Sequence, residues 1–120
     1  MISEKKLVDQ FVRELACKKK KFTASYISTT LDVDVDFIKK RLIQLSNDGQ
    51  LIINFDVVCP YKCNHKIIDT YTSLNDIPIG KFVECKCGNV FVIAKENVYV
   101  TFSPNEIYYD DEMCEKRKFI

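Results

Sequence analysis

The fold of this 120-residue chain is decided by residues 22–52, which read FTASYISTTLDVDVDFIKKRLIQLSNDGQLI. Thr23 is a residue type that caps helix starts, and the short helix predicted after it would bury Ile27 and Leu31. The Asp-Val-Asp sequence at residues 32–34 is expected to end this helix. This stretch therefore predicts a short helix, a tight turn and the start of a second helix.

A longer helix is predicted from about Val35 to Asn47. Its apolar residues recur at spacings of three and four, the period of a buried helix face, and they are Val35, Ile38, Leu42 and Leu45. Gly49 can adopt the left-handed conformation that ends a helix. Residues 51–58 are apolar or β-branched at most positions and predict a strand that leads directly into Cys59.

The N-terminal flank predicts another helix. Ser3 can cap it, and residues 3–20 repeat apolar side chains with the helical period at Leu7, Val8, Phe11, Val12 and Leu15. Four consecutive lysines at 18–21 follow, which could contact phosphate but are also typical of a solvated helix end.

The C-terminal flank predicts short strands at residues 66–71, 81–85, 90–94, 98–102 and 106–109, the last three as a meander. Alternation would place residues 98, 100 and 102 on one half-buried face. Residues 110–120 begin acidic and end basic, which fits either a short helix or a loose tail.

Four cysteines in two close pairs frame the second half of the chain: Cys59, Cys63, Cys85 and Cys87. Two pairs of thiols, each in a tight turn, are what a tetrahedral zinc ion requires. Pro60 and Gly88 are residue types that suit such turns. The spacing leaves three residues inside the first pair and one inside the second, which differs from the usual knuckle with two. We expect a structural Zn²⁺ cofactor held by these four thiolates.

Other interpretations of the cysteines and of the single histidine remain open. Ordinary buried thiols are one alternative, and they suit Cys17, at the end of an apolar helical stripe, whereas Cys114 in a charged segment could be exposed. His65 could replace one thiolate or act only near the metal. A catalytic zinc would need an open coordination position, which would arise only if Cys59 or Cys63 were not a ligand.

Composition narrows the class of protein. The net charge of +1 is not the signature of a strong polyanion binder. No apolar run approaches the roughly 20 residues that span a bilayer, and the first residues lack a signal-peptide pattern, so we expect a cytoplasmic protein. Because thiols stay reduced in that compartment, six cysteines would indicate metal before disulfide.

Three helices followed by a strand, with the ending Leu45-Ser-Asn-Asp-Gly-Gln-Leu-Ile52, resemble a winged helix-turn-helix. The resemblance covers about the first half of the chain and implies a three-helix winged helix at residues 1–58. Together with the cysteine pairs and the strands predicted after it, this gives an α+β fold with a zinc-ribbon-like antiparallel β-module at 59–109 and a tail at 110–120. This layout is similar to the alpha subunit of general transcription factor E and to small bacterial regulators. The strand that should form the wing instead enters the cysteine knuckle.

In winged helices the solvent face of the recognition helix enters the major groove, which here implies a DNA- or partner-binding set of Lys39, Lys40, Ile43, Gln44 and Asn47. Lysine, glutamine and asparagine suit phosphates and base edges, whereas Asp36 and Ile43 are poor DNA partners. Tyr99, Tyr108 and Tyr109 could also serve an interface if exposed.

We therefore expect a non-enzymatic regulator that binds DNA in transcriptional control. The alternative is a protein-docking adaptor subunit of a larger complex, such as a polymerase-associated, antiviral defence or phage system. An enzyme is disfavoured because the chain has three glycines and no phosphate loop, one histidine, and no nucleophile with an evident base. Nothing in the sequence indicates a small-molecule substrate.

Overall fold

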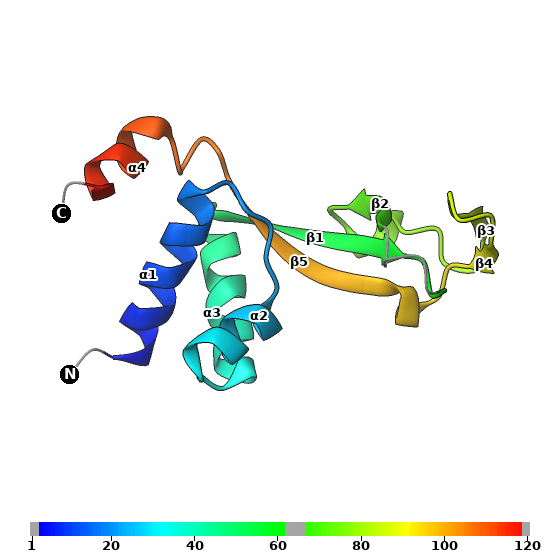
Figure 1. Cartoon of the computed structure of the whole chain (residues 1–120), viewed down its shortest axis with the longest axis horizontal. Coiled ribbons are helices and arrows are strands. Elements are labelled where there is room, and N and C mark those ends of the chain that lie inside the picture. The colour runs from blue at the N-terminus through cyan, green and yellow to red at the C-terminus, as the bar shows by residue number, and fades with distance from the viewer. Residues whose placement is uncertain (1–2, 62–66, 119–120) are drawn as a thin grey trace. The chain divides into compact units, whose positions relative to one another are not determined.

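The computed structural model describes residues 3–61 and 67–118, and it has the predicted α+β class (Figure 1). Residues 1–53 and 102–120 form one compact unit, here the helical unit, and residues 54–101 form a second, here the cysteine unit. The predicted division of the chain at residue 58 stays a prediction.

The three N-terminal helices of the helical unit are confirmed, each with a side-chain cap. Helix α1 spans Glu4–Cys17, α2 spans Ala24–Leu31 and α3 spans Val35–Asn47. The side-chain oxygens of Ser3, Thr23 and Asp34 each accept a hydrogen bond from a backbone N–H three residues on, at 3.1 to 3.2 Å. Gly49 has the expected left-handed φ of 81° after α3.

Helix α1 ends three residues before the predicted position. Lys19 adopts a left-handed φ of 56°, and the backbone N–H groups of Lys19 and Lys20 donate to the carbonyls of Ala16 and Leu15. This is the Schellman pattern that satisfies the last carbonyls of a helix, with a lysine where glycine is usual. A lysine run offers no glycine signal, which is why the predicted helix was too long.

The core of the helical unit is built from the predicted helical stripes. Its buried members include Val8, Val12, Ile27, Ile38, Leu42 and Leu45, with Leu51 from the strand that follows. The segment between α1 and α2 joins this core through Phe22, whose backbone exchanges two hydrogen bonds with Phe102 at 2.9 and 2.8 Å. The two phenyl rings are stacked with centroids 6.2 Å apart.

An ion pair also connects α1 to α3. The Arg41 guanidinium donates from Nε and Nη2 to the two carboxylate oxygens of Asp9, at 2.8 and 2.9 Å. The hydrogen bond to Asp9 raises the pKa of Arg41, although burial acts in the opposite direction. Arg41 also donates from Nη1 to Gln44 Oε1 at 3.0 Å, so its orientation is fixed on both sides.

A three-stranded sheet has the order β2-β1-β5, with β1 at Leu51–Val58, β2 at Ile67–Tyr71 and β5 at Val98–Pro104. Strands β1 and β2 are antiparallel. Asp56 on β1 is 2 % exposed, and its carboxylate accepts hydrogen bonds from Thr70 Oγ1 on β2 and Thr101 Oγ1 on β5, at 2.8 and 3.0 Å. One buried carboxylate therefore connects all three strands.

A second sheet contains only the hairpin of β3, Phe82–Glu84, and β4, Val90–Val92. Short 3-10 helices, η1 at Leu74–Asp76 and η2 at Lys95–Asn97, precede β3 and β5. The predicted meander is therefore wrong, because β4 pairs with β3 and β5 pairs with β1. The prediction that Val100 shares a buried face is also wrong, since its side chain is 47 % exposed.

Residues 106–109 were predicted to form a strand, but they form a turn. Asn105 instead holds a turn: its carbonyl accepts from the N–H groups of Tyr108 and Tyr109, and its side-chain Oδ1 accepts from that of Ile107. Asn105 Nδ2 also donates to the Gly49 carbonyl at 2.8 Å. Residues 111–118 then form helix α4, Asp111–Lys118, which resolves the alternative between helix and loose tail.

Candidate metal centre and exposed surfaces

Three of the four predicted ligands lie together in the cysteine unit. The Sγ atoms of Cys59, Cys85 and Cys87 all lie within 4.8 Å of one another, and those of Cys59 and Cys87 are 3.9 Å apart. Sulfurs at about 2.3 Å from a tetrahedral zinc are about 3.8 Å from one another. The spacing of the three thiols therefore fits a shared zinc ion.

Local structure explains how the thiols meet. Cys59 follows directly after β1, and Cys85 and Cys87 lie in the loop that joins β3 to β4. That loop is closed by hydrogen bonds from the Cys85 N–H to the Asn89 carbonyl and from the Gly88 N–H to the Cys85 carbonyl. Gly88 has a φ of 92°, which confirms the prediction that a glycine suits the turn at this position.

The thiols also belong to the apolar interior of the unit. Cys59 and Cys85 are 1 % and 2 % exposed, and they pack with Val57, Ile77, Phe91 and Ile93. Cys87 is exposed, and its sulfur accepts a hydrogen bond from Asn89 Nδ2 at 3.4 Å. A metal in this position would join β1 to the β3–β4 loop inside a very small core.

Asn89 was not among the predicted site residues. A donor to a ligating thiolate stabilises the charged form of the sulfur and orients it. The only sequence signal for this role is that Asn89 follows Cys87 by two residues. Asparagine is also common in turns that bind no metal, so this signal alone does not identify a site residue.

The fourth position is not described. Cys63 and His65, the expected ligand and its possible substitute, both lie outside the described residues. The choice between a fourth thiolate and an imidazole therefore stays a prediction, as does the assignment of the metal.

The remaining two cysteines correct an expectation. Cys17 at the end of α1 and Cys114 in α4 form a disulfide. The prediction of metal before disulfide was therefore wrong for this pair, and neither residue is the ordinary buried or exposed thiol that the sequence suggested. The pairing brings together positions 97 residues apart, which no local pattern reveals.

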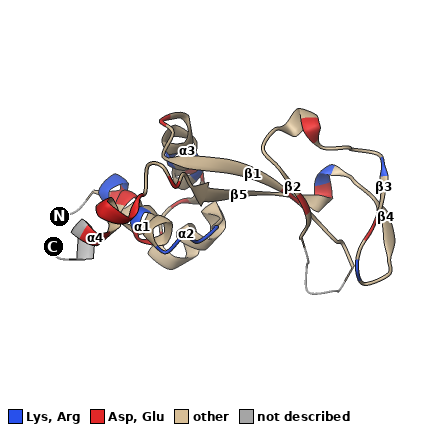
Figure 2. Ribbon diagram, turned by 90° about the horizontal axis from the view of Figure 1, so that it is seen from above, with Lys and Arg blue, Asp and Glu red and all other residues tan. Residues whose placement is uncertain are grey.

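The predicted binding face of α3 is solvent-exposed along its length. Lys39, Lys40, Ile43, Gln44 and Asn47 are all exposed, with Ile43 at 47 %. Phe37, on the same helix, is 38 % exposed. Figure 2 shows that basic positions also occur in the segment from α1 to α2, whereas acidic positions occur on α4.

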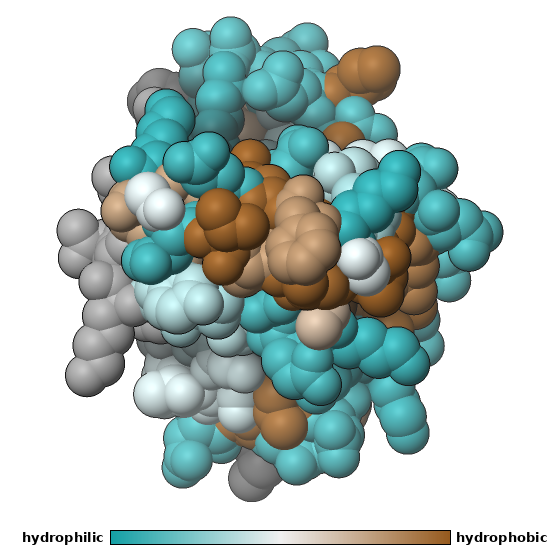
Figure 3. All heavy atoms as spheres, turned by 90° about the vertical axis from the view of Figure 1, so that its right-hand side faces the viewer, coloured by the Kyte–Doolittle hydropathy of each residue, from teal (hydrophilic) through white to brown (hydrophobic). Residues whose placement is uncertain are grey.

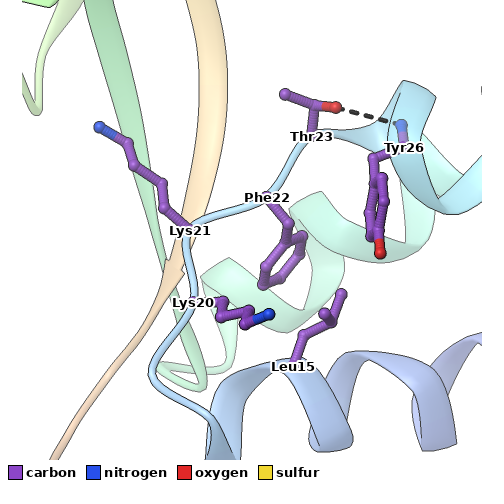
Figure 4. A pocket seen from close by; sticks show the side chains of 6 residues that line it. All are labelled: Leu15, Lys20, Lys21, Phe22, Thr23 and Tyr26. Atoms are coloured by element: carbon purple, nitrogen blue, oxygen red, sulfur yellow. Dashed lines mark hydrogen bonds between the residues drawn. The ribbon is translucent and has the colours of Figure 1, made fainter.

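A cavity of about 390 Å³ lies beside that basic segment in the helical unit. Its lining consists of Leu15, Lys20, Lys21, Phe22, Thr23 and Tyr26 (Figure 4). In this view the Lys20 side chain extends between Leu15 and Phe22, whereas Lys21 points away. The cavity therefore combines an apolar floor with one nearby ammonium group.

The β3–β4 hairpin presents an apolar outer face. Phe82 pairs with Val92 across the hairpin, and these side chains are 78 % and 41 % exposed, with Val90 at 53 %. The space-filling view in Figure 3 shows apolar side chains gathered near the centre of the face that it draws. Of the three tyrosines considered for an interface, Tyr99 and Tyr108 are exposed, but Tyr109 is 5 % exposed and belongs to the core.

No protein-family model matches this chain, and neither a curated protein nor a solved structure matches it. Within the described ranges 3–61 and 67–118, no helix is both long and apolar enough to cross a membrane.

Proposed function

We propose that this chain is a non-enzymatic, zinc-stabilised winged-helix protein that binds duplex DNA through α3. The winged-helix assignment is supported by the order of three capped helices and then paired strands, with the left-handed Gly49 between α3 and β1. A role in transcriptional control is the use of DNA binding that this architecture suggests by analogy.

The zinc is proposed to be held by Cys59, Cys85 and Cys87 together with Cys63. Its role would be structural, because four thiolates leave no position for a reactive water. Residues 54–101 alone are too few to bury a large core, and domains of this size commonly depend on a metal or a disulfide. The three clustered thiols supply such a connection.

The observation that carries the DNA proposal is the composition of the exposed α3 face. Lys39 and Lys40 can neutralise phosphates, and Asn47 can donate to and accept from base edges. Gln44, whose Oε1 accepts from Arg41, can donate to a base edge from Nε2. Arg41 is engaged by Asp9, so it orients α3 on α1 and contributes less to a phosphate contact.

Protein docking is the second candidate, and a specific observation favours it. Ile43 lies at the centre of the same exposed face, where a large apolar side chain gains little from a DNA backbone but suits an apolar protein contact. The net charge of +1 also supplies little non-specific attraction for a polyanion.

The test is a fluorescence-anisotropy titration of the zinc-loaded full chain with mixed-sequence duplex DNA, at low and moderate salt. The DNA proposal expects saturable binding that weakens as salt rises. Absence of binding at low salt would reject it in favour of docking.

A further inference from the structure

The disulfide between Cys17 and Cys114 differs from the metal cluster in its surroundings. Both disulfide cysteines are only partly buried, whereas Cys59 and Cys85 are almost fully enclosed. The two Cα atoms are 5.5 Å apart, which is usual for a bridged pair. A partly exposed disulfide is open to attack by a thiolate from solution.

The described part of helix α4 makes a small apolar contact with the helical unit. Of its described side chains, only Met113 and Cys114 pack against the apolar core, and none is fully buried. With eight residues it is also shorter than the roughly 12–15 residues at which an isolated helix becomes marginally stable. The disulfide is therefore a covalent restraint that keeps α4 on the core.

The segment before α4 is held independently of the disulfide. The Asn105 N–H donates to the Gln50 carbonyl at 3.0 Å, and Tyr109 is buried with its hydroxyl 3.3 Å from Gln50 Oε1. These contacts join residues 105–109 to the turn after α3. Loss of the disulfide should therefore free the chain only beyond Tyr109.

We propose that Cys17 and Cys114 form a reversible thiol–disulfide exchange site whose reduction releases α4 from the helical unit. The co-reactant is a dithiol or a pair of monothiols such as glutathione. A reductant thiolate attacks one sulfur, the protein S–S bond breaks, and a mixed disulfide forms while the other cysteine leaves as thiolate. A second reductant thiol resolves the mixed disulfide, so two electrons and two protons reach the protein and the reductant becomes a disulfide.

The docking of α4 on the helical unit therefore depends on the ratio of thiol to disulfide in the surrounding solution. When the pair is oxidised, Met113 and Cys114 cover part of the core surface near the end of α1. When it is reduced, residues 110–118 lose that anchor and the covered surface opens to solvent. The metal cluster is already composed of thiols, so this exchange leaves its ligands unchanged.

The experiment uses the zinc-loaded full chain equilibrated in glutathione buffers of stepped redox ratio. Alkylation followed by mass spectrometry measures how much of the Cys17–Cys114 pair is reduced, and hydrogen exchange measures protection of each segment. We expect reversible reduction within the glutathione series, accompanied by exchange about tenfold or more faster at residues 111–118 and no change at residues 105–109. The comparison of the wild-type chain in its two redox states requires no substitution, so a folding defect of a variant cannot cause the difference in exchange.

Cys114→Ser should reproduce the exchange pattern of the reduced protein in every buffer. Equal protection of α4 in both redox states would overturn the release step. A pair that stays oxidised, or stays reduced, across the entire series would overturn reversibility.

Discussion

The Sγ atoms of Cys59 and Cys87 lie 3.9 Å apart, although the two cysteines are 28 positions apart in the sequence. One thiol follows the end of β1 and the other lies in the β3–β4 loop, so their approach depends on the fold of the whole cysteine unit. Unligated thiolates at this distance would repel one another, and a divalent cation between them removes the repulsion. Metal binding and folding of residues 54–101 should therefore be coupled.

The first prediction is that the purified chain holds one zinc ion and that Cys85→Ser loses it. Loss should unfold the cysteine unit, because the binding free energy of a structural zinc is folding free energy. Metal analysis after dialysis and a thermal melt measure the two effects. Cys63→Ser should behave like Cys85→Ser, whereas His65→Ala should keep its zinc.

Cys114→Ser is the matched control for this prediction, since it removes a cysteine of the disulfide and leaves the metal cluster intact. It should retain a full equivalent of zinc. A metal-free wild-type protein with a folded cysteine unit would contradict the zinc assignment.

The second prediction concerns the ion pair between Asp9 and Arg41. Arg41→Lys should lower the free energy of unfolding by about 0.5–1 kcal/mol, because lysine cannot form the bidentate contact with the partly exposed carboxylate. The folded protein raises the pKa of Arg41, so the ion pair contributes fully to the free energy of unfolding at every pH below the pKa that Arg41 has in the unfolded chain. This contribution is lost only in strongly alkaline solution, as the pH rises through the pKa of Arg41 in the folded protein. Urea unfolding near neutral pH measures the change, and an Asp9→Asn, Arg41→Lys double variant that showed additive losses would argue against direct coupling.

The third prediction concerns Lys19, which holds a left-handed conformation that costs a lysine roughly 1–2 kcal/mol. Lys19→Gly should therefore raise the free energy of unfolding by about 1 kcal/mol, measured by urea unfolding. Lys20→Gly is the control, because Lys20 has no positive φ and glycine there should not stabilise the chain. Equal effects of the two substitutions would point to the loss of charge as the cause.

The fourth prediction concerns Asp56. Asp56→Ala should destabilise the protein by about 1–3 kcal/mol, because the buried hydroxyl of Thr101 and the hydroxyl of the solvent-exposed Thr70 both lose their carboxylate acceptor. The exposed Asp76 provides a comparison, since Asp76→Ala should change stability by less than about 0.5 kcal/mol. Both variants are compared by urea unfolding in the presence of zinc, and a small effect for Asp56→Ala would mean that the carboxylate is not important for the sheet.

Local signals predicted the helices well. The caps Ser3, Thr23 and the periodic residues of α3 act within a few positions of one another, so their structural consequences can be inferred from short windows. The strand pairing could not be inferred in this way. β1 pairs with β5 although the 39 residues 59–97 lie between them, and the alternation of β5 does not identify its partner. The disulfide between Cys17 and Cys114 could not be predicted for the same reason, because two cysteines 97 residues apart form no local sequence pattern.

The last prediction separates DNA binding from protein docking on α3. If duplex DNA is the partner, Lys40→Ala should weaken binding and reduce the slope of log K against log salt by about one, because one phosphate contact is lost. Lys5→Ala removes an exposed lysine from α1 instead and should leave the slope unchanged. Ile43→Ser, which adds no charge, should have little effect on the duplex titration.

If a protein is the partner, the relative effects of the two substitutions on binding are reversed. Ile43→Ser should lower affinity for the purified partner by about tenfold or more, because it removes a large apolar contact, while Lys40→Ala has a small effect. Titrations of all three variants against the duplex and against the purified partner would therefore distinguish the two functions, and a wild-type chain that bound the duplex with no difference between Lys40→Ala and Lys5→Ala would exclude α3 as the DNA-binding face.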